Sequence, residues 1–160
     1  MLGKAVDEHD PTALITAGEP APGTEGFRQT HRQALRAQDV ANVARTGARV
    51  TTFAHVGPVA LLLADLEATR GWVWQMLGPL ATDDAHNARL RETLLVFLST
   101  GSSYTATAEI LTVHKNTVQY RVRKSEETIG HPIQDRRADI ELALRACHYL
   151  GSPVLRPPQI

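Results

Sequence analysis

Cationic and amide side chains gather in residues 104–124, which read YTATAEILTVHKNTVQYRVRK. The last ten of these residues contain no acid. Their four cations are Lys115, Arg121, Arg123 and Lys124. Cationic side chains bind phosphate groups, and the amides of Asn116 and Gln119 have the geometry that recognises adenine. The segment therefore predicts contact with DNA, provided that the backbone presents these groups on one face.

A helix-turn-helix would present them in this way. It requires a small residue where its two helices cross, a turn of about three residues, and apolar residues that hold the second helix against the first. Ala108 meets the first requirement, and residues 112–114 fit the turn, with Val113 directed inward. Val118 and Val122 are four residues apart, so they share the buried face of the second helix. The expected packing face of the first helix consists of Ala106, Ile110 and Leu111.

The opposite face of the second helix carries the side chains that we predict to contact double-stranded DNA. These are His114, Lys115, Asn116, Thr117, Gln119, Tyr120, Arg121, Arg123 and Lys124. The backbone amides at the start of this helix could hold a phosphate as well. Thr112 stands in the turn where glycine is frequent. The alternative interpretation of the same spacing is a helical hairpin with a basic, solvated outer face.

The elements before this motif mix strand and helix patterns as far as residue 82. We expect a strand at 12–18, a helix at 25–44, a strand at 49–56, a helix that starts at Pro58, and a helix at 66–77. Thr24 and Asp65 are the expected N-caps of the first and last of these helices. A two-stranded sheet would make this region thin.

Residues 83–152 are predicted to be all helical. Asp83 and Asp84 would cap the first helix of this region, Gly101 would end it, and Asp135 would cap the last helix, which Gly151 ends. Residues 153–160 are rich in proline and are expected to form a flexible tail. The predicted fold class is mainly α, with an α+β N-terminal remnant followed by an all-α helix-turn-helix domain.

The composition suits a small intracellular protein. The chain has 160 residues, with 17 basic and 17 acidic side chains, which argues against a surface that coats nucleic acid or membrane broadly. Cys147 is the single cysteine, so an internal disulfide is excluded, and we expect a buried structural thiol. The sequence lacks an apolar run of the ~18 residues that a membrane span needs and lacks a signal-peptide core. We expect a cytoplasmic protein without membrane contact.

Residues 108–122, AEILTVHKNTVQYRV, resemble the C-terminal helix-turn-helix of the PucR/CdaR family of bacterial transcriptional regulators. Residues 90–108, 127–135 and 140–146 extend the resemblance in the same order. The family's run of His, a basic residue, Asn, Thr, Val, any residue, Tyr and Arg is occupied here by His114, Lys115, Asn116, Thr117, Val118, Tyr120 and Arg121. Lys115 stands where arginine is common, which keeps the charge and loses the two-pronged fork.

Residues 18–35 and 49–65 resemble the last part of the GGDEF-like middle domain of such regulators. In that family the domain is usually not a nucleotide cyclase, and this sequence contains no GGDEF or GGEEF stretch. The resemblance implies that residues 1–82 are a partial, non-catalytic GGDEF-like domain. Because relatives also carry an N-terminal sensory domain, the chain looks like the C-terminal part of a larger regulator or a shortened paralogue.

The sequence thus predicts a transcriptional regulator that is not an enzyme and uses no cofactor. The seven histidines have no pair at a spacing of three or four, so we expect no metal site. One helix-turn-helix is too small for tight specific binding, so a homodimer on two half-sites is expected. Trp72 and Trp74 cannot share one helix face and suggest a subunit contact. The alternatives are a protein-interaction or dimerisation module and an effector-binding degenerate cyclase-like domain; the effector and the operator stay unidentified.

Overall fold

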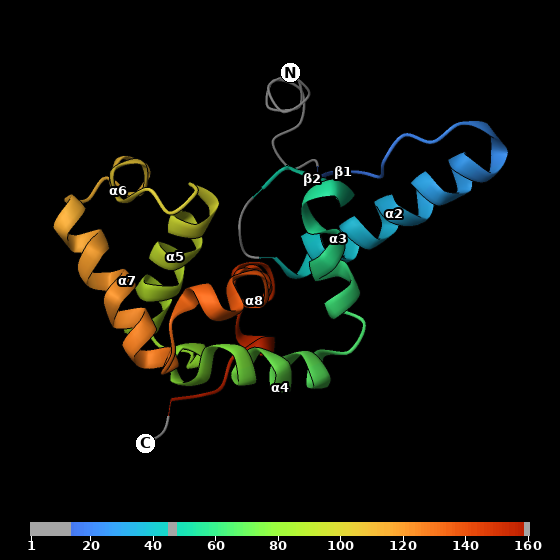
Figure 1. Ribbon diagram of the computed structural model, residues 1–160. Coiled ribbons are helices and arrows are strands. Elements are labelled where there is room, and N and C mark those ends of the chain that lie inside the picture. Colours follow the sequence, from blue (N-terminus) through green and yellow to red (C-terminus); the bar gives the residue numbers. More distant parts are fainter. Residues whose placement is uncertain (1–13, 45–47, 159–160) are drawn as a thin grey trace. The chain divides into compact units, whose positions relative to one another are not determined.

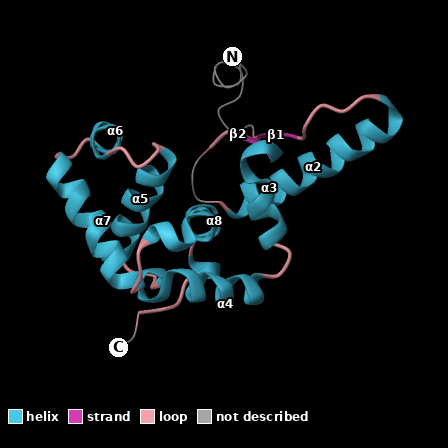
Figure 2. Cartoon of the chain, in the orientation of Figure 1, coloured by secondary structure: helices cyan, strands magenta, loops and turns pink. Residues whose placement is uncertain are grey.

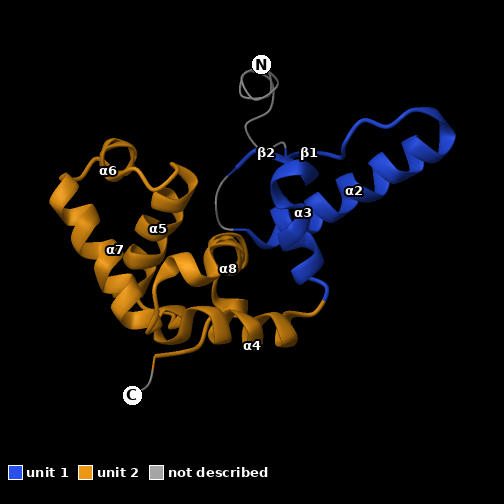
Figure 3. Cartoon of the chain, viewed as in Figure 1, with its two compact units in different colours: residues 1–64 blue, residues 65–160 orange. Residues whose placement is uncertain are grey.

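The computed structural model describes residues 14–44 and 48–158 (Figure 1). The chain divides into two compact units, residues 1–64 and 65–160 (Figure 3). Helices dominate both units, and the described strands lie in the first (Figure 2). This arrangement confirms the predicted fold class, in which a small sheet precedes an all-helical region.

The first unit is a small βαβ arrangement with one further helix. Its elements are β1 (Ile15–Ala17), α2 (Gly23–Val43), β2 (Val50–Thr52) and α3 (Phe53–Leu62). The two strands are parallel and pair Ile15 with Val50. α2 connects them and contacts β1 and α3. The core of this unit consists of Ala37, Val40, Val56, Val59 and Ala60, which are all buried.

The second strand is shorter than predicted, and the helix after it starts earlier. β2 ends at Thr52, and α3 begins at Phe53, so Pro58 lies inside α3 rather than at its start. The pairing of β2 with β1 stops at Thr52, after which the backbone satisfies its polar groups within a helix. Gly57 permits the tight packing, because a Cβ there would lie 3.1 Å from the Phe53 ring. The predicted cap of α2 is also wrong, since Pro22 rather than Thr24 takes the N-cap position.

The second unit is helical throughout its described length. Its elements are α4 (Leu66–Leu77), η1 (Gly78–Ala81), α5 (Ala85–Ser99), α6 (Tyr104–Leu111), α7 (Lys115–Ile129), η2 (Ile133–Arg136), α8 (Arg137–Leu150) and η3 (Ser152–Val154). α5 contacts α6, α7 and α8, and α4 lies against α8 (Figure 1). Its largest fully buried side chains are Leu77, Leu80, Leu94, Ile140 and Leu144. Each helix of the described residues is too short or too polar to cross a membrane.

Of the four aspartates predicted to cap helices, Asp65 and Asp84 take N-cap positions, and Asp83 and Asp135 do not. Asp65 accepts a hydrogen bond from the Ala68 amide at 3.0 Å, and Asp84 accepts one from the Asn87 amide at 2.8 Å. The bond from the Asn87 amide is the main reason that the pKa of Asp84 is lowered. The prediction for Asp135 is wrong, because this residue lies in the 3₁₀ turn η2 and α8 begins at Arg137.

Residues 152–156 pack against the helices, which corrects the expectation that the chain is flexible from residue 153 onward; residues 159–160 of the predicted tail lie outside the described residues. Val154 is fully buried, and Leu155 is 6% exposed. Arg156 exchanges backbone hydrogen bonds with Ala81 and Asp83 at 3.0 and 2.7 Å. Its guanidinium lies 4.0 Å from the centre of the Trp74 ring, so one of the two tryptophans contacts the tail. Because α4 also contacts η3, the division between units falls after residue 64 rather than near Thr82.

Candidate nucleic-acid interface

α6 and α7 form the helix-turn-helix that the spacing predicted. The turn consists of Thr112, Val113 and His114, as expected. Thr112 adopts the left-handed conformation, with φ 53° and ψ 46°. Its position at the end of α6 is one that glycine often fills, because a Cβ is unfavourable there. The amide of Val113 donates to the carbonyl of Ala108 at 3.0 Å, which closes the turn.

The crossing of the two helices is closely packed. Ala108 is 8% exposed, Val118 is fully buried and Val122 is 4% exposed, as their spacing predicted. Ile110 was expected to pack here, but it is 60% exposed, so that prediction is wrong. Thr107 takes the buried position instead, and its hydroxyl donates to the Ser103 carbonyl at 2.7 Å. A threonine gives little signal of burial in sequence because its hydroxyl is polar, yet here the hydroxyl is satisfied locally by the carbonyl four residues earlier.

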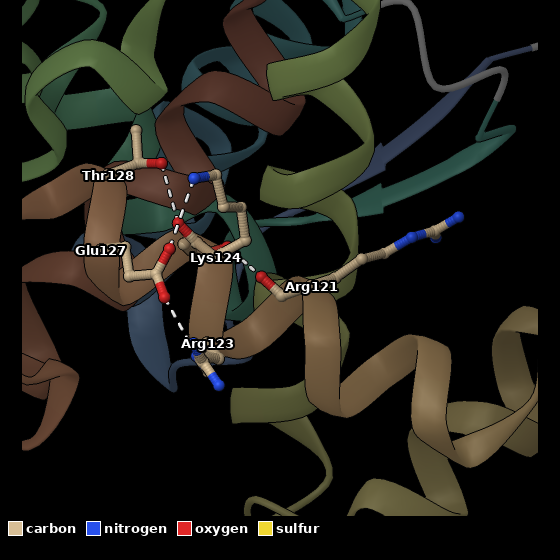
Figure 4. A network of polar contacts seen from close by, with 6 residues as sticks. Arg121, Arg123, Lys124, Glu127 and Thr128 are labelled. Carbon is tan, nitrogen blue, oxygen red and sulfur yellow. Dashed lines mark hydrogen bonds and ion pairs between the residues drawn. The ribbon is translucent and has the colours of Figure 1, made fainter.

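α5 supports both helices of the motif. The rings of Phe97 on α5 and Tyr104 on α6 stack with centroids 4.7 Å apart. Arg121 on α7 donates from Nη1 to the hydroxyl of Thr93, which is fully buried on α5, at 3.2 Å. Arg121 therefore turns away from the other cations of α7 (Figure 4). In the structure Arg121 contacts the supporting helix α5, whereas the sequence analysis predicted that it contacts DNA.

Arg137 holds the loop before α6 in place. Its guanidinium donates to the Ser102 hydroxyl at 2.7 Å and to the Leu98 carbonyl at 3.0 Å. Ser102 has φ 65°, a conformation that costs energy for a residue with a Cβ. Sequence reasoning missed this arginine because 35 residues separate it from the serine that it binds.

One face of α7 is exposed and polar. It is formed by His114, Lys115, Asn116, Gln119, Tyr120 and Arg123, which are all exposed. Tyr120 is 63% exposed although it is a large aromatic residue. Thr117 and Lys124 are half-buried at the edges of this face. The structure thus brings most of the predicted DNA-contacting residues onto one side of one helix.

His114 caps the start of α7 with its ring. Nδ1 accepts a hydrogen bond from the Asn116 amide at 3.2 Å. A neutral imidazole that accepts at Nδ1 carries its proton on Nε2, so this ring can offer one donor to a ligand. The cap also occupies one of the amides that a phosphate would otherwise use at this helix start.

Arg123 and Lys124 share an acidic partner that sequence reasoning passed over (Figure 4). Glu127 accepts from Arg123 Nε at 2.9 Å and from Lys124 Nζ at 3.3 Å. The pKa of Glu127 is lowered, chiefly by the hydrogen bond from Arg123 and then by the one from Lys124. The signal was present in the sequence, because residues three and four apart are neighbours on a helix.

Arg91 and Cys147 are buried in this unit and have structural roles. Arg91 is buried and donates from Nη1 to the carbonyls of Leu80 and Thr82, each at 2.7 Å. Burial lowers the pKa of Arg91 and raises the pKa of the Cys147 thiol to about 12, so the thiol is unreactive. Across the described part of the chain, His, Cys, Asp and Glu side chains do not gather in groups of three that could hold a metal ion.

Known proteins match the same region. Residues 90–146 match the family model of the PucR C-terminal helix-turn-helix domain. The chain is 37% identical over 76 residues to the transcriptional activator PmfR of Paenarthrobacter nicotinovorans, which covers 48% of this chain and 16% of that protein. It is 34% identical over 87 residues to the purine catabolism regulatory protein of Bacillus subtilis (strain 168), which covers 54% of this chain and 16% of that protein.

A third relative is the uncharacterized protein in the pkwA 5′ region of Thermomonospora curvata, at 37% identity over 78 residues. That match covers 49% of this chain and 43% of the relative. No solved structure shows a significant match. Each of these matches covers less than half of the relative's own length. The matched segment contains both helices of the motif: residues 90–146 match the PucR C-terminal helix-turn-helix domain, and α6 and α7 lie within them.

Proposed function

We propose that this chain is a sequence-specific, DNA-binding transcriptional regulator that places α7 in the major groove. The observation that carries this proposal is the exposed polar face of α7, which belongs to a helix-turn-helix in the segment that matches the family model. In such motifs the second helix enters the major groove and its first turns reach the base edges. Two relatives support the same role: one is named a transcriptional activator, and the other is named a purine catabolism regulatory protein.

Residues near the start of α7 are the proposed base readers. Asn116 and Gln119 are exposed and can each pair with the N6 and N7 positions of adenine through two hydrogen bonds. Lys115 can donate to guanine, and His114 can donate from Nε2. Tyr120 offers a hydroxyl and a ring at the middle of the same face. We assign Thr117, at the edge of the face, a supporting contact.

Residues near the end of α7 are the proposed phosphate contacts. Arg123 and Lys124 lie beyond the turns that sit deepest in a groove, where side chains more often meet the DNA backbone. Arg121 is a positioning residue in this proposal, because its side chain is bonded to Thr93 on α5. It would fix the rotation of α7 about its own axis and so decide which side chains face the bases.

The oligomeric state and the role of the first unit complete the proposal. A single helix-turn-helix buries little surface on DNA, so we propose a homodimer on half-sites about 34 Å apart. We assign residues 1–82 no catalytic role and keep the interpretation that they are a partial GGDEF-like domain, of which the first compact unit takes up residues 1–64. The support for that interpretation is the sequence resemblance described above. The proposal implies action in the cytoplasm, where bacterial DNA lies.

The test is a selection of bound fragments from random DNA, followed by titration of the best site and a scrambled site by fluorescence anisotropy. Replacing Asn116 with alanine should weaken binding to the best site about 5- to 150-fold more than binding to the scrambled site, because a good base contact is worth about 1–3 kcal/mol of discrimination. Gln75→Ala, which removes an exposed amide from α4, is the matched control and should change neither affinity.

Two outcomes would contradict this assignment. Equal losses on both DNAs would make Asn116 a phosphate contact rather than a base reader. Failure to bind any DNA would favour a protein-interaction module, for which the first unit offers exposed apolar side chains. Phe27 is 71% exposed and Leu35 is 46% exposed on α2. Salt dependence separates the two functions, because DNA binding weakens steeply as salt is added.

A further inference from the structure

The proposed phosphate contacts of α7 are already engaged with a carboxylate in the free protein (Figure 4). Glu127 bonds Arg123 at 2.9 Å and Lys124 at 3.3 Å, so two cations and one anion form a charge trio on one exposed turn. The side chain of Arg123 is 82% exposed, and those of Glu127 and Lys124 are 46% and 41% exposed. The trio is thus open to solvent and to any ligand that approaches this face.

A DNA phosphate and the Glu127 carboxylate are competitors for the same donors. Both are anionic oxygen acceptors, and a guanidinium binds either one with similar geometry. When a phosphate takes Arg123 and Lys124, the carboxylate loses both partners and is left beside a second anion. An unpaired carboxylate near the DNA backbone repels it and retains a counterion.

We propose that Glu127 is an internal counter-charge that limits the sequence-independent affinity of α7 for DNA and reduces the salt dependence of binding. The inference rests on the proposed function, since it concerns the same face of the same helix. Glu127 acts through Arg123 and Lys124 and is therefore a positioning residue rather than a DNA-contacting one. By restraining phosphate binding, it leaves a larger share of the binding energy to the base readers near Asn116.

Replacement of Glu127 with glutamine tests the proposal, because the substitution removes the charge and keeps the size. E127Q should bind both the best site and a scrambled site about two- to fivefold more tightly at low salt. In this variant a phosphate no longer has to break the ion pairs of Glu127, and exposed ion pairs are weak. The slope of log affinity against log salt should steepen by up to about one unit, the share of one further counterion.

The chain offers a matched control on another helix. Glu141 bonds Arg145 at 2.9 Å with the same four-residue spacing on α8. E141Q therefore makes the same change of charge and breaks the same kind of ion pair away from α7. It should leave the salt slope on both DNAs unchanged, so a shift confined to E127Q excludes a general effect of net charge.

A double-mutant cycle ties the effect to the two cations. Replacing Arg123 and Lys124 with alanine should weaken all sequences alike and flatten the salt slope by up to about two units. In that background E127Q should have no further effect, because the groups through which it acts are gone. A residue that merely stabilised α7 would alter the thermal midpoint and would not alter the salt slope.

The outcomes separate this inference from the function on which it rests. If the unmodified chain binds no DNA at any salt concentration, the proposed function and this inference both fail. If it binds DNA and E127Q leaves affinity and slope unchanged, the inference alone is overturned. Weaker binding by E127Q would also overturn it, because Glu127 would then orient Arg123 toward its phosphate rather than compete with it.

Discussion

Thr112 shows how a single residue can carry strain at the centre of the motif. Its left-handed backbone, with φ 53°, lets the chain leave α6 and enter α7 within three residues. For a residue with a Cβ this conformation costs about 1–2 kcal/mol. The same position suits glycine without strain, at the cost of more freedom in the unfolded chain.

Replacing Thr112 with glycine should therefore raise the free energy of unfolding by about 0.5–1 kcal/mol, measured by urea denaturation. Thr105→Gly is the matched control, since Thr105 is exposed inside α6. That control should lower the stability, because glycine is a poor helix former. Destabilisation by T112G would mean that the threonine side chain contributes more to the turn than its backbone costs.

At the scale of the elements, the motif depends on how closely α6 and α7 approach. Ala108 is 8% exposed at their crossing, next to the buried Val118 and Val122. Arg121, Phe97 and Arg137 tie the pair to α5 and α8. These contacts fix the rotation of α7 about its own axis and its position along α5, and so decide which side chains the exposed face presents to a ligand.

Ala108→Leu should overpack this crossing and lower the free energy of unfolding by about 1–3 kcal/mol. DNA binding should fall with it, since the two helices can no longer hold their angle. Ala138→Leu makes the same change on an exposed position of α8 and should alter stability by less than about 0.5 kcal/mol. A stable A108L protein with normal DNA binding would show that the motif is placed wrongly.

At the scale of the whole molecule, the C-terminal segment joins α4 to the helix-turn-helix domain. Arg70 on α4 donates twice to the Pro153 carbonyl, at 2.9 and 2.7 Å. Arg156 bonds the backbone beside η1 and covers Trp74. α4 precedes residues 90–146 in the chain, yet these contacts make it part of the same compact unit.

Leu155→Ala should lower the free energy of unfolding by about 2–3 kcal/mol, because it removes a buried side chain and leaves a cavity. Ile110→Ala is the control, since Ile110 is 60% exposed, and its effect should stay within about 0.5 kcal/mol. Thermal or urea unfolding of the full chain measures both. If both substitutions changed the free energy of unfolding by the same small amount, the tail would be flexible, as the proline-rich sequence predicts.

The sequence by itself determined the features that depend on neighbours a few residues apart. The three-residue turn, the caps by Asp65 and Asp84, and the shared buried face of Val118 and Val122 all follow from helix geometry and local hydrogen bonding. The pairing of Glu127 with Arg123 belongs to the same class, because the i to i+4 spacing alone places the two groups together.

Only the tertiary structure decided the features that depend on distant residues. Arg121 turns from the exposed face because a threonine 28 positions away accepts its hydrogen bond. Residues 153–156 dock because Arg70, 83 positions before Pro153, supplies two donors to its carbonyl. Ile110 is exposed because Thr107 and Ala108 take the helix crossing. Hydrophobicity and spacing rank the residues that can be buried, but the available partner surface decides which of them are.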